Sequence, residues 1–362
     1  MKNNKIGNTL LVILAFFIGA AGMYALVKYS PDAVQTIVNK SEKEVTITDN
    51  GIADAVEKIY DSVVVIGGYE NGILSSSGTG FVYEEDNKYA YILTNSHVVD
   101  TSTSVKVKFT NGKVEDVELV GSDSYSDIAV LKISKDKIIS VAEIGETKPL
   151  RVGDTVFAIG APLDDEYSWT VTRGILSGKD RLVDISASSS TTADWVMSVL
   201  QTDAAINSGN SGGPLANSNG EVIGITNMKL VSDGVEGIGF AIPVEDAITY
   251  AKELREKGKI ERPFLGISML DASDTMNLSR YRISIAANLE GAVVIQTQEG
   301  SPAHEAKLET GDVITKIEDY EVTSVAKLKY YLYKYKPGDK VKITYVRGDK
   351  TETTTIKLAK SE

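Results

Sequence analysis

The sequence contains no cysteine and only two histidines, His97 and His304, among its 362 residues. Without cysteine the chain cannot form a disulfide, use a thiolate nucleophile or build the common structural zinc sites. The two histidines are far apart, so we expect no metal site and no cofactor. Basic residues are also in the minority, since 38 Lys and Arg face 50 Asp and Glu and the net charge is −12. This balance argues against a nucleic-acid partner.

The N-terminal segment contains an uncharged apolar stretch, residues 6–27, which follows Lys2 and Lys5. A helix of about 22 residues would span about 33 Å, enough for a hydrocarbon core of about 30 Å. We therefore expect residues 1–28 to form a cytoplasmic N-terminus and a transmembrane anchor, followed by a tether at 29–51. The rest of the chain would lie outside the cytoplasmic membrane. Small residues at 20–22 leave a cleaved signal peptide as the alternative.

One serine lies in a glycine-rich turn, Ile206-Asn207-Ser208-Gly209-Asn210-Ser211-Gly212-Gly213-Pro214-Leu215. Such a turn exposes the hydroxyl of Ser211 and lets the backbone N–H groups of Gly209 and Ser211 point at one spot. Acyl transfer needs this combination of an accessible nucleophile and preorganised donors for an oxyanion. The same residues fit the Gly-x-Ser-x-Gly turn of α/β-hydrolases.

The order of other polar residues distinguishes these two classes of serine hydrolase. A serine nucleophile needs a base, and His97 lies where an apolar run ends, while Asp127 opens a later one. The order His97, Asp127, Ser211 is that of chymotrypsin-like proteases, whereas an α/β-hydrolase has its histidine after the serine. Only His304 follows Ser211, and we expect it to be exposed in another domain. The sequence therefore predicts a chymotrypsin-like triad.

The segments around these three residues resemble those of the HtrA family of trypsin-like serine proteases. Further matches are residues 201–207 before the nucleophile and residues 220–225 and 237–243 after it. The resemblance covers roughly residues 52–358. It implies two six-stranded β-barrels with the triad in the cleft between them, followed by one PDZ domain, and it implies a homotrimer.

The distribution of apolar residues fits the same organisation. Short β-branched runs separated by Gly, Asn, Asp and Ser fill most of residues 52–258, as is typical of a β-sandwich or barrel. Apolar residues then recur at helical spacing after Pro243, and Gly258 can cap that helix. We predict a mostly-β, chymotrypsin-like protease domain at 52–258, a linker at 259–263 and an α+β domain at 264–362.

This second domain resembles the PDZ domains attached to HtrA proteases. The sequence predicts a short helix that opens at Ser301-Pro302 and ends at Gly311-Asp312, a strand at 313–317 and a helix after Ser324. By resemblance, Phe264, Leu265, Gly266 and Ile267 form the loop whose amides hold the C-terminal carboxylate of a peptide. The peptide would add as a strand beside this loop.

The predicted mechanism is acyl transfer, in which His97 deprotonates Ser211 and Asp127 orients His97. The backbone amides of Gly209 and Ser211 stabilise the oxyanion, and Asn210 shapes the turn. The residues expected to line the specificity pocket contain no acid, which argues against Lys or Arg in the substrate and favours small or medium aliphatic residues. They are Ile206, Asn207, Ser208, Ile225, Thr226, Asn227, Gly237 and Gly239. Ile206 and Ile225 fit a plain core role equally well.

The oxyanion turn cannot be ordered by a freshly cut N-terminus, because a tether precedes the protease domain. We expect the loops 179–199 and 227–237 to be ordered by peptide binding at the PDZ domain or by trimer contacts. The sequence thus predicts a membrane-anchored serine endopeptidase that degrades misfolded or unfolded exported proteins. The alternative is a chaperone-like protein that holds unfolded polypeptides with little cleavage.

Overall fold

The computed structural model of the chain describes residues 14–22, 24–25, 28, 50–161, 168–185, 193–227 and 237–361. They belong to two units, Met1–Asp49 and Asn50–Glu362. In the first unit, residues 14–22 are helical and exposed. No helix within the described ranges is both long and apolar enough to cross a membrane. Most of the predicted anchor, and residues 29–49 of the predicted tether, lie outside the described residues.

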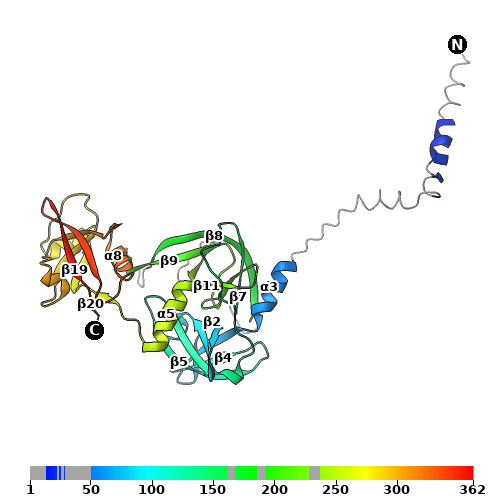
Figure 1. Cartoon of the computed structure of the whole chain (residues 1–362), viewed down its shortest axis with the longest axis horizontal. Coiled ribbons are helices and arrows are strands. Elements are labelled where there is room, and N and C mark those ends of the chain that lie inside the picture. The colour runs from blue at the N-terminus through cyan, green and yellow to red at the C-terminus, as the bar shows by residue number, and fades with distance from the viewer. Residues whose placement is uncertain are drawn as a thin grey trace, which may run out of the picture. The chain divides into compact units, whose positions relative to one another are not determined.

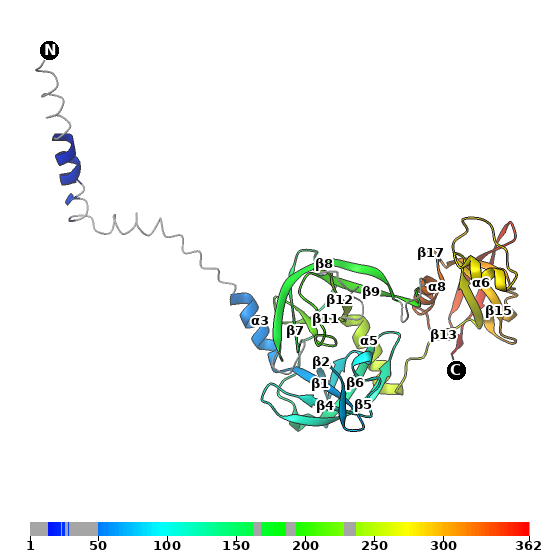
Figure 2. The same cartoon turned by 180° about the vertical axis from the view of Figure 1, so that it is seen from behind.

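The second unit begins with a helix, α3 (Asn50–Tyr60), where we predicted the end of a tether and the first short strands. Its apolar side chains, Ala55 and Ile59 among them, recur three and four residues apart and form one face of the helix. This face packs against Phe157 on strand β7 (Thr155–Gly160), and Figures 1 and 2 both place α3 beside β7. The helix is therefore part of the protease domain.

Six antiparallel strands close into a first barrel in the order β1-β2-β3-β6-β5-β4. Their bounds are β1 (Val63–Glu70), β2 (Ile73–Glu85), β3 (Tyr89–Thr94), β4 (Ser104–Lys108), β5 (Val114–Asp123) and β6 (Ile128–Ser134). A single-turn helix, α4 (Ser96–Val99), follows β3, and a 3₁₀ turn, η1 (Lys135–Lys137), follows β6. Ile66 and Leu131 are among the fully buried residues of the barrel core.

A second barrel closes in the order β10-β11-β12-β9-β8-β7. Its strands after β7 are β8 (Thr170–Ile185), β9 (Trp195–Thr202), β10 (Pro214–Asn217), β11 (Val222–Thr226) and β12 (Gly239–Pro243). Leu215 and Ile223 are fully buried in its core. The two barrels, visible in cyan and green in Figure 1, confirm the predicted double-barrel protease fold.

The predicted helix after Pro243 is present as α5 (Val244–Lys257). It ends as predicted, because Gly258 adopts the left-handed conformation (φ +72°) and its N–H donates to the carbonyl of Leu254. The buried face of α5 belongs to the largest apolar cluster, which also contains Phe81 from the first barrel and Ile225 from the second. This shared core joins the two barrels.

The C-terminal domain is the predicted PDZ domain. Its main sheet has the order β14-β15-β16-β18-β19, with β17 paired to β16, and a separate pair is formed by β13 and β20. The strands are β13 (Pro263–Phe264), β14 (Ile267–Asp271), β15 (Ala292–Thr297), β16 (Val313–Ile317), β17 (Tyr320–Glu321), β18 (Lys340–Arg347), β19 (Lys350–Lys357) and β20 (Ala359–Lys360).

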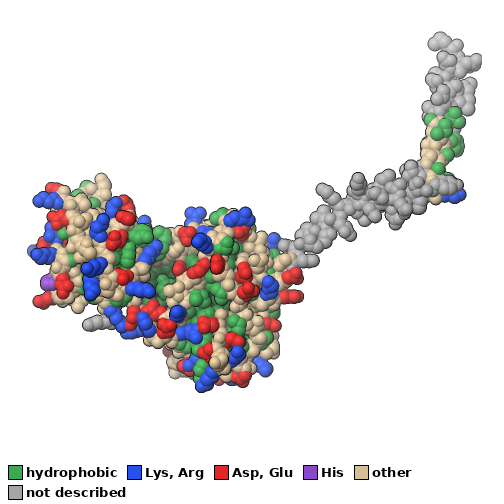
Figure 3. Space-filling model, in the orientation of Figure 1, with side chains coloured by type: hydrophobic (Ala, Val, Ile, Leu, Met, Phe, Trp, Pro, Cys, Tyr) green, Lys and Arg blue, Asp and Glu red, His purple; other side chains and the backbone are tan. Residues whose placement is uncertain are grey.

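Three helices complete this domain: α6 (Thr275–Arg280), α7 (Pro302–Glu305) and α8 (Val325–Leu332). Helix α7 begins where predicted but ends at Glu305, well before the predicted Gly311. The backbone of Lys307 is left-handed there (φ +60°), which stops the helix. On the face shown in Figure 3, acidic and basic side chains are interspersed over the surface.

Candidate functional site

The turn that carries Ser211 precedes β10 and is closed by its own backbone. The N–H of Asn210 donates to the carbonyl of Asn207 at 3.0 Å, and the N–H of Gly213 donates to the carbonyl of Asn210 at 2.9 Å. Gly212 has a φ of +84°. A Cβ atom at Gly212 would lie 2.2 Å from the carbonyl oxygen of Thr79, so only glycine fits there.

Thr79 on β2 fastens this turn to the first barrel. Its N–H donates to the carbonyl of Ser211 at 2.9 Å, and its hydroxyl donates to the carbonyl of Gly209 at 2.6 Å. From the other side, the hydroxyl of Thr226 donates to the carbonyl of Asn210 at 2.5 Å. Our sequence interpretation missed Thr79. Its position between Gly78 and Gly80 was the one local signal that backbone approaches closely here.

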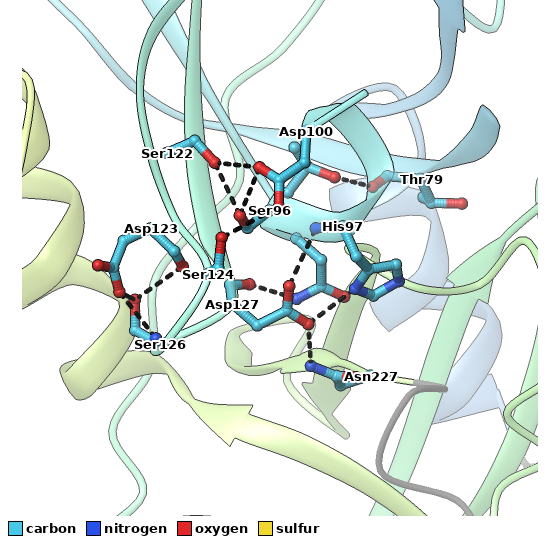
Figure 4. Close-up of polar contacts among 12 residues, drawn as sticks. Thr79, Ser96, His97, Asp100, Ser122, Asp123, Ser124, Ser126, Asp127 and Asn227 are labelled. Atoms are coloured by element: carbon cyan, nitrogen blue, oxygen red, sulfur yellow. Dashed lines mark hydrogen bonds and ion pairs between the residues drawn. The ribbon is translucent and has the colours of Figure 1, made fainter. Parts of the chain in front are cut away.

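His97 and Asp127 meet at one end of the paired strands β3 and β6 of the first barrel. His97 lies in α4, directly after β3, and Asp127 ends the turn between β5 and β6. Nδ1 of His97 lies 2.7 Å from Oδ2 of Asp127, and the backbone N–H of His97 donates to Oδ1 at 3.0 Å (Figure 4). Because a carboxylate only accepts, Nδ1 carries the proton and Nε2 is left as the basic nitrogen.

The carboxylate of Asp127 is buried, with 2% of the residue exposed, and it has further donors. The side-chain amide of Asn227 donates to Oδ2 at 2.7 Å, and that of Asn95 donates to the backbone carbonyl of Asp127 at 2.9 Å. Asp127 itself has a left-handed backbone (φ +53°), a conformation that Asp and Asn tolerate better than most residues. These contacts hold the carboxylate toward His97.

We expect Asn227→Ala to lower kcat/KM for peptide hydrolysis roughly 10- to 100-fold, because a hydrogen bond to a charged group contributes about 1.5–3 kcal/mol. The measurement is steady-state hydrolysis of a fluorogenic peptide across pH. Asn111→Ala is the matched control, since Asn111 is exposed in a distant turn. Equal activity of both variants would contradict a role for Asn227 in orienting Asp127.

The predicted pocket residues differ in burial: some lie in the core, some contact the turn of Ser211 or Asp127, and some are exposed. Ile206 is 7% exposed and Ile225 is fully buried, and both belong to apolar core clusters. Thr226 contacts the turn of Ser211, and Asn227 contacts Asp127, as described above. Asn207, Ser208 and Gly237 are exposed. Gly239 leaves room for the side chain of Ile206, because a Cβ atom at position 239 would lie 2.6 Å from Cγ1 of Ile206. Residues 186–192 and 228–236 of the predicted regulatory loops lie outside the described residues.

The predicted carboxylate loop of the PDZ domain turns at Gly266, whose φ is +77°. The N–H of Gln298 donates to the carbonyl of Gly266 at 2.8 Å, and the N–H of Ala303 donates to that of Leu265 at 3.0 Å. The loop leads into β14, which pairs with β15 and forms one edge of the main sheet.

Among the described residues no group of three or more His, Asp or Glu is placed to hold a metal ion.

Comparisons with known proteins match both domains. Residues 78–225 match the model of the trypsin-like peptidase domain, and residues 263–358 match that of the PDZ domain. The serine protease Do-like HtrA of Bacillus subtilis (strain 168) is 44% identical over 292 residues, which are 80% of this chain and 64% of that protein. The chain thus spans just under two thirds of that relative's length.

Two further matches cover more of the compared protein. The serine protease Do-like HtrB of Bacillus subtilis (strain 168) is 38% identical over 382 residues, covering 96% of this chain and 82% of that protein. The crystal structure of the serine endoprotease from Yersinia pestis superposes with a TM-score of 0.65 at 30% identity, covering 86% of this chain and 98% of that one.

Proposed function

Because this chain belongs to the HtrA family of serine endopeptidases, we propose that it cleaves unfolded or misfolded exported polypeptides with His97, Asp127 and Ser211 as its triad. The observation that supports this assignment most strongly is the 2.7 Å contact between Nδ1 of His97 and Oδ2 of Asp127. That contact leaves the other ring nitrogen of His97 free of its proton and able to act as a base.

The reaction proceeds through an acyl-enzyme. His97 takes the proton of Ser211 Oγ as Oγ attacks the peptide carbonyl carbon, and the oxygen of the tetrahedral intermediate accepts from the backbone N–H groups of Gly209 and Ser211. His97 then donates its proton to the leaving amine, and the C–N bond breaks. Water, activated by His97, hydrolyses the ester on Ser211. Asn210 holds the turn in shape between the two donors.

The PDZ domain binds the C-terminus of a peptide in this proposal. Strand β14 is an edge strand that can pair with an added peptide strand, and the loop Phe264–Ile267 lies at its start. Peptide binding, or contacts within a homotrimer, would order the loops around the turn of Ser211. Residues 6–27 would anchor the protease to the membrane with its catalytic and PDZ domains outside; their uncharged apolar composition supports this.

We expect a preference for small or medium aliphatic residues on the N-terminal side of the cleaved bond. The residues assigned to the pocket include no carboxylate that could neutralise a bound Lys or Arg. Two peptides that differ only in valine or lysine at that position should differ in kcat/KM by roughly 10-fold or more. Equal cleavage of the two peptides would exclude this pocket assignment.

The proposed function is tested with the full chain, its Ser211→Ala variant and unfolded casein, with and without a peptide that ends in a hydrophobic residue. Cleavage by the unchanged chain alone supports the protease, and faster cleavage with the peptide supports regulation through the PDZ domain. If neither protein cleaves casein while both suppress its aggregation equally, the chain holds unfolded polypeptides rather than degrading them.

A further inference from the structure

Arg262, in the linker between α5 and β13, forms a two-pronged ion pair with Asp123 of the first barrel. Its two terminal nitrogens donate to the two carboxylate oxygens at 2.6 and 2.7 Å. The side chains are only 17% and 11% exposed. A paired fork of this kind fixes the relative orientation of both groups as well as their distance.

Asp123 in turn shapes the turn that ends in the proposed catalytic aspartate. It is the last residue of β5 and pairs with Ile128 of β6 across this turn. Its Oδ2 accepts from the backbone N–H of Ser126 at 2.8 Å and from the hydroxyl of Ser126 at 2.7 Å (Figure 4). Asp127 follows directly, in its left-handed conformation. A displacement of Asp123 therefore moves the residue next to Asp127.

The ion pair is present over the whole range in which the enzyme would work. Burial alone would raise the pKa of Asp123, but the Arg262 guanidinium and the Ser126 donors hold that pKa below its ordinary value of 3.8. The carboxylate is consequently ionised at any pH above that value. Arg262 stays protonated because its pKa is raised further by Asp123, against the opposing effect of burial.

Arg262 also contacts the PDZ domain. Its guanidinium carbon lies 4.7 Å from the ring centre of Tyr125, in the same β5–β6 turn, and 5.3 Å from that of Tyr333, at the end of α8. The two rings are themselves in edge-to-face contact at 4.8 Å. Arg262 thus lies between the β5–β6 turn and the PDZ helix α8, and the rings of Tyr125 and Tyr333 both attract its positive charge.

A second carboxylate, Asp100, secures the other side of the same turn without involving the PDZ domain. Its Oδ1 accepts from the hydroxyls of Ser96 and Ser122, each at 2.7 Å (Figure 4). Asp100 follows α4 directly, so this contact ties the helix of His97 to the end of β5. The turn is therefore held from within the protease domain as well as from the linker.

We propose that Arg262 is a positioning residue for proteolysis. Through its ion pair with Asp123, it fixes the position of the turn that carries Asp127. Through its contact with Tyr333, the position of this turn depends on the docking of the PDZ helix α8. The proposal rests on the assignment of Asp127 and His97 made above. It predicts that the linker, besides connecting two domains, determines how well the carboxylate supports the histidine.

The test uses the full chain and its Arg262→Gln variant, which keeps most of the side-chain volume but loses the charge. We expect kcat for a fluorogenic peptide to fall roughly 10- to 100-fold with little change in KM, because a small misplacement of a catalytic group has effects of this size. The apparent pKa of the base in the pH profile of kcat/KM should also fall, since a displaced Asp127 stabilises the imidazolium less. Arg262→Lys should recover part of both losses, and Tyr333→Leu should show a smaller effect of the same kind.

Arg347→Gln is the matched control. Arg347 also makes a two-pronged ion pair, with Asp312 at 2.7 Å on each arm, but both partners lie within the PDZ domain. Unchanged kcat and pH profile in folded Arg262→Gln, or equal losses in the Arg262 and Arg347 variants, would overturn the proposal. The Asp127→Asn variant distinguishes a failure of this proposal from a failure of the triad assignment. If Asp127→Asn and Arg262→Gln are both fully active, the triad assignment is wrong. If Asp127→Asn is inactive while Arg262→Gln is fully active, only the role proposed for Arg262 is wrong.

Discussion

Replacing Ser211 by alanine is expected to lower kcat for peptide hydrolysis by about 10⁴–10⁶-fold, because no other group can take over as the nucleophile. The fold should be unaffected. Ser211 contacts the first barrel through its backbone carbonyl, which accepts from the N–H of Thr79, and alanine keeps that carbonyl. Gly209 and Gly212, whose positive φ angles the turn requires, are also unchanged.

The measurement is kcat for a fluorogenic peptide, combined with the melting temperature of each protein. Ser218→Ala is the matched control, because Ser218 is exposed in the turn between β10 and β11 of the same barrel. We expect both variants to melt like the parent and only the Ser211 variant to be inactive. An Ser211→Ala protein that retained the parent rate would show that another residue attacks the peptide.

Asp127→Asn is expected to reduce kcat near pH 7 by about 10⁴-fold. The backbone can accept the change, since Asn tolerates a left-handed conformation as Asp does. The side chain cannot. Oδ2 of Asp127 faces two donors, from His97 and Asn227, and Oδ1 faces the backbone N–H of His97. An amide offers one oxygen and one NH₂ group, so either orientation places a donor against a donor.

The consequence for His97 is the wrong tautomer or a tilted ring, and either one removes the base that Ser211 needs. The pH profile of kcat separates this effect from unfolding, which circular dichroism reports independently. Asp116→Asn serves as the control, since that carboxylate is 78% exposed on β5. A rate within tenfold of the parent at pH 7 would contradict the assignment of Asp127.

Features that depend on local pattern could be predicted from the sequence. The helix α5 and its end at Gly258 follow from apolar spacing and one glycine, and the start of α8 follows from Ser324, whose hydroxyl accepts from the N–H of Lys327. The double barrel and the PDZ domain followed from resemblance rather than from strand patterns. Helix α3 was missed although Ala55 and Ile59 have helical spacing, because the polar residues before it suggested a continuing tether.

The supports of the site could not be predicted, because they join residues that are distant in the sequence. Thr79 bonds to Gly209, Asn227 bonds to Asp127, and Arg262 bonds to Asp123. The glycines beside Thr79 signal only that backbone approaches closely there, and none of the three partners can be read from the local sequence. Each role appears only when the barrels and the linker are packed together. Chain order predicts the reacting groups, whereas folding determines what holds them.

The hydrogen bonds between Thr79 and the turn of Ser211 also determine when the predicted triad can assemble. A polypeptide that emerges from its N-terminus presents His97 and Asp127 first, in the part of the chain that forms the first barrel. Ser211 and Asn227 come later, and the turn of Ser211 is held by Thr79 only once the second barrel has docked on the first. A half-synthesised molecule therefore has no complete triad, and its first opportunity to cut arises only after both barrels have formed and docked.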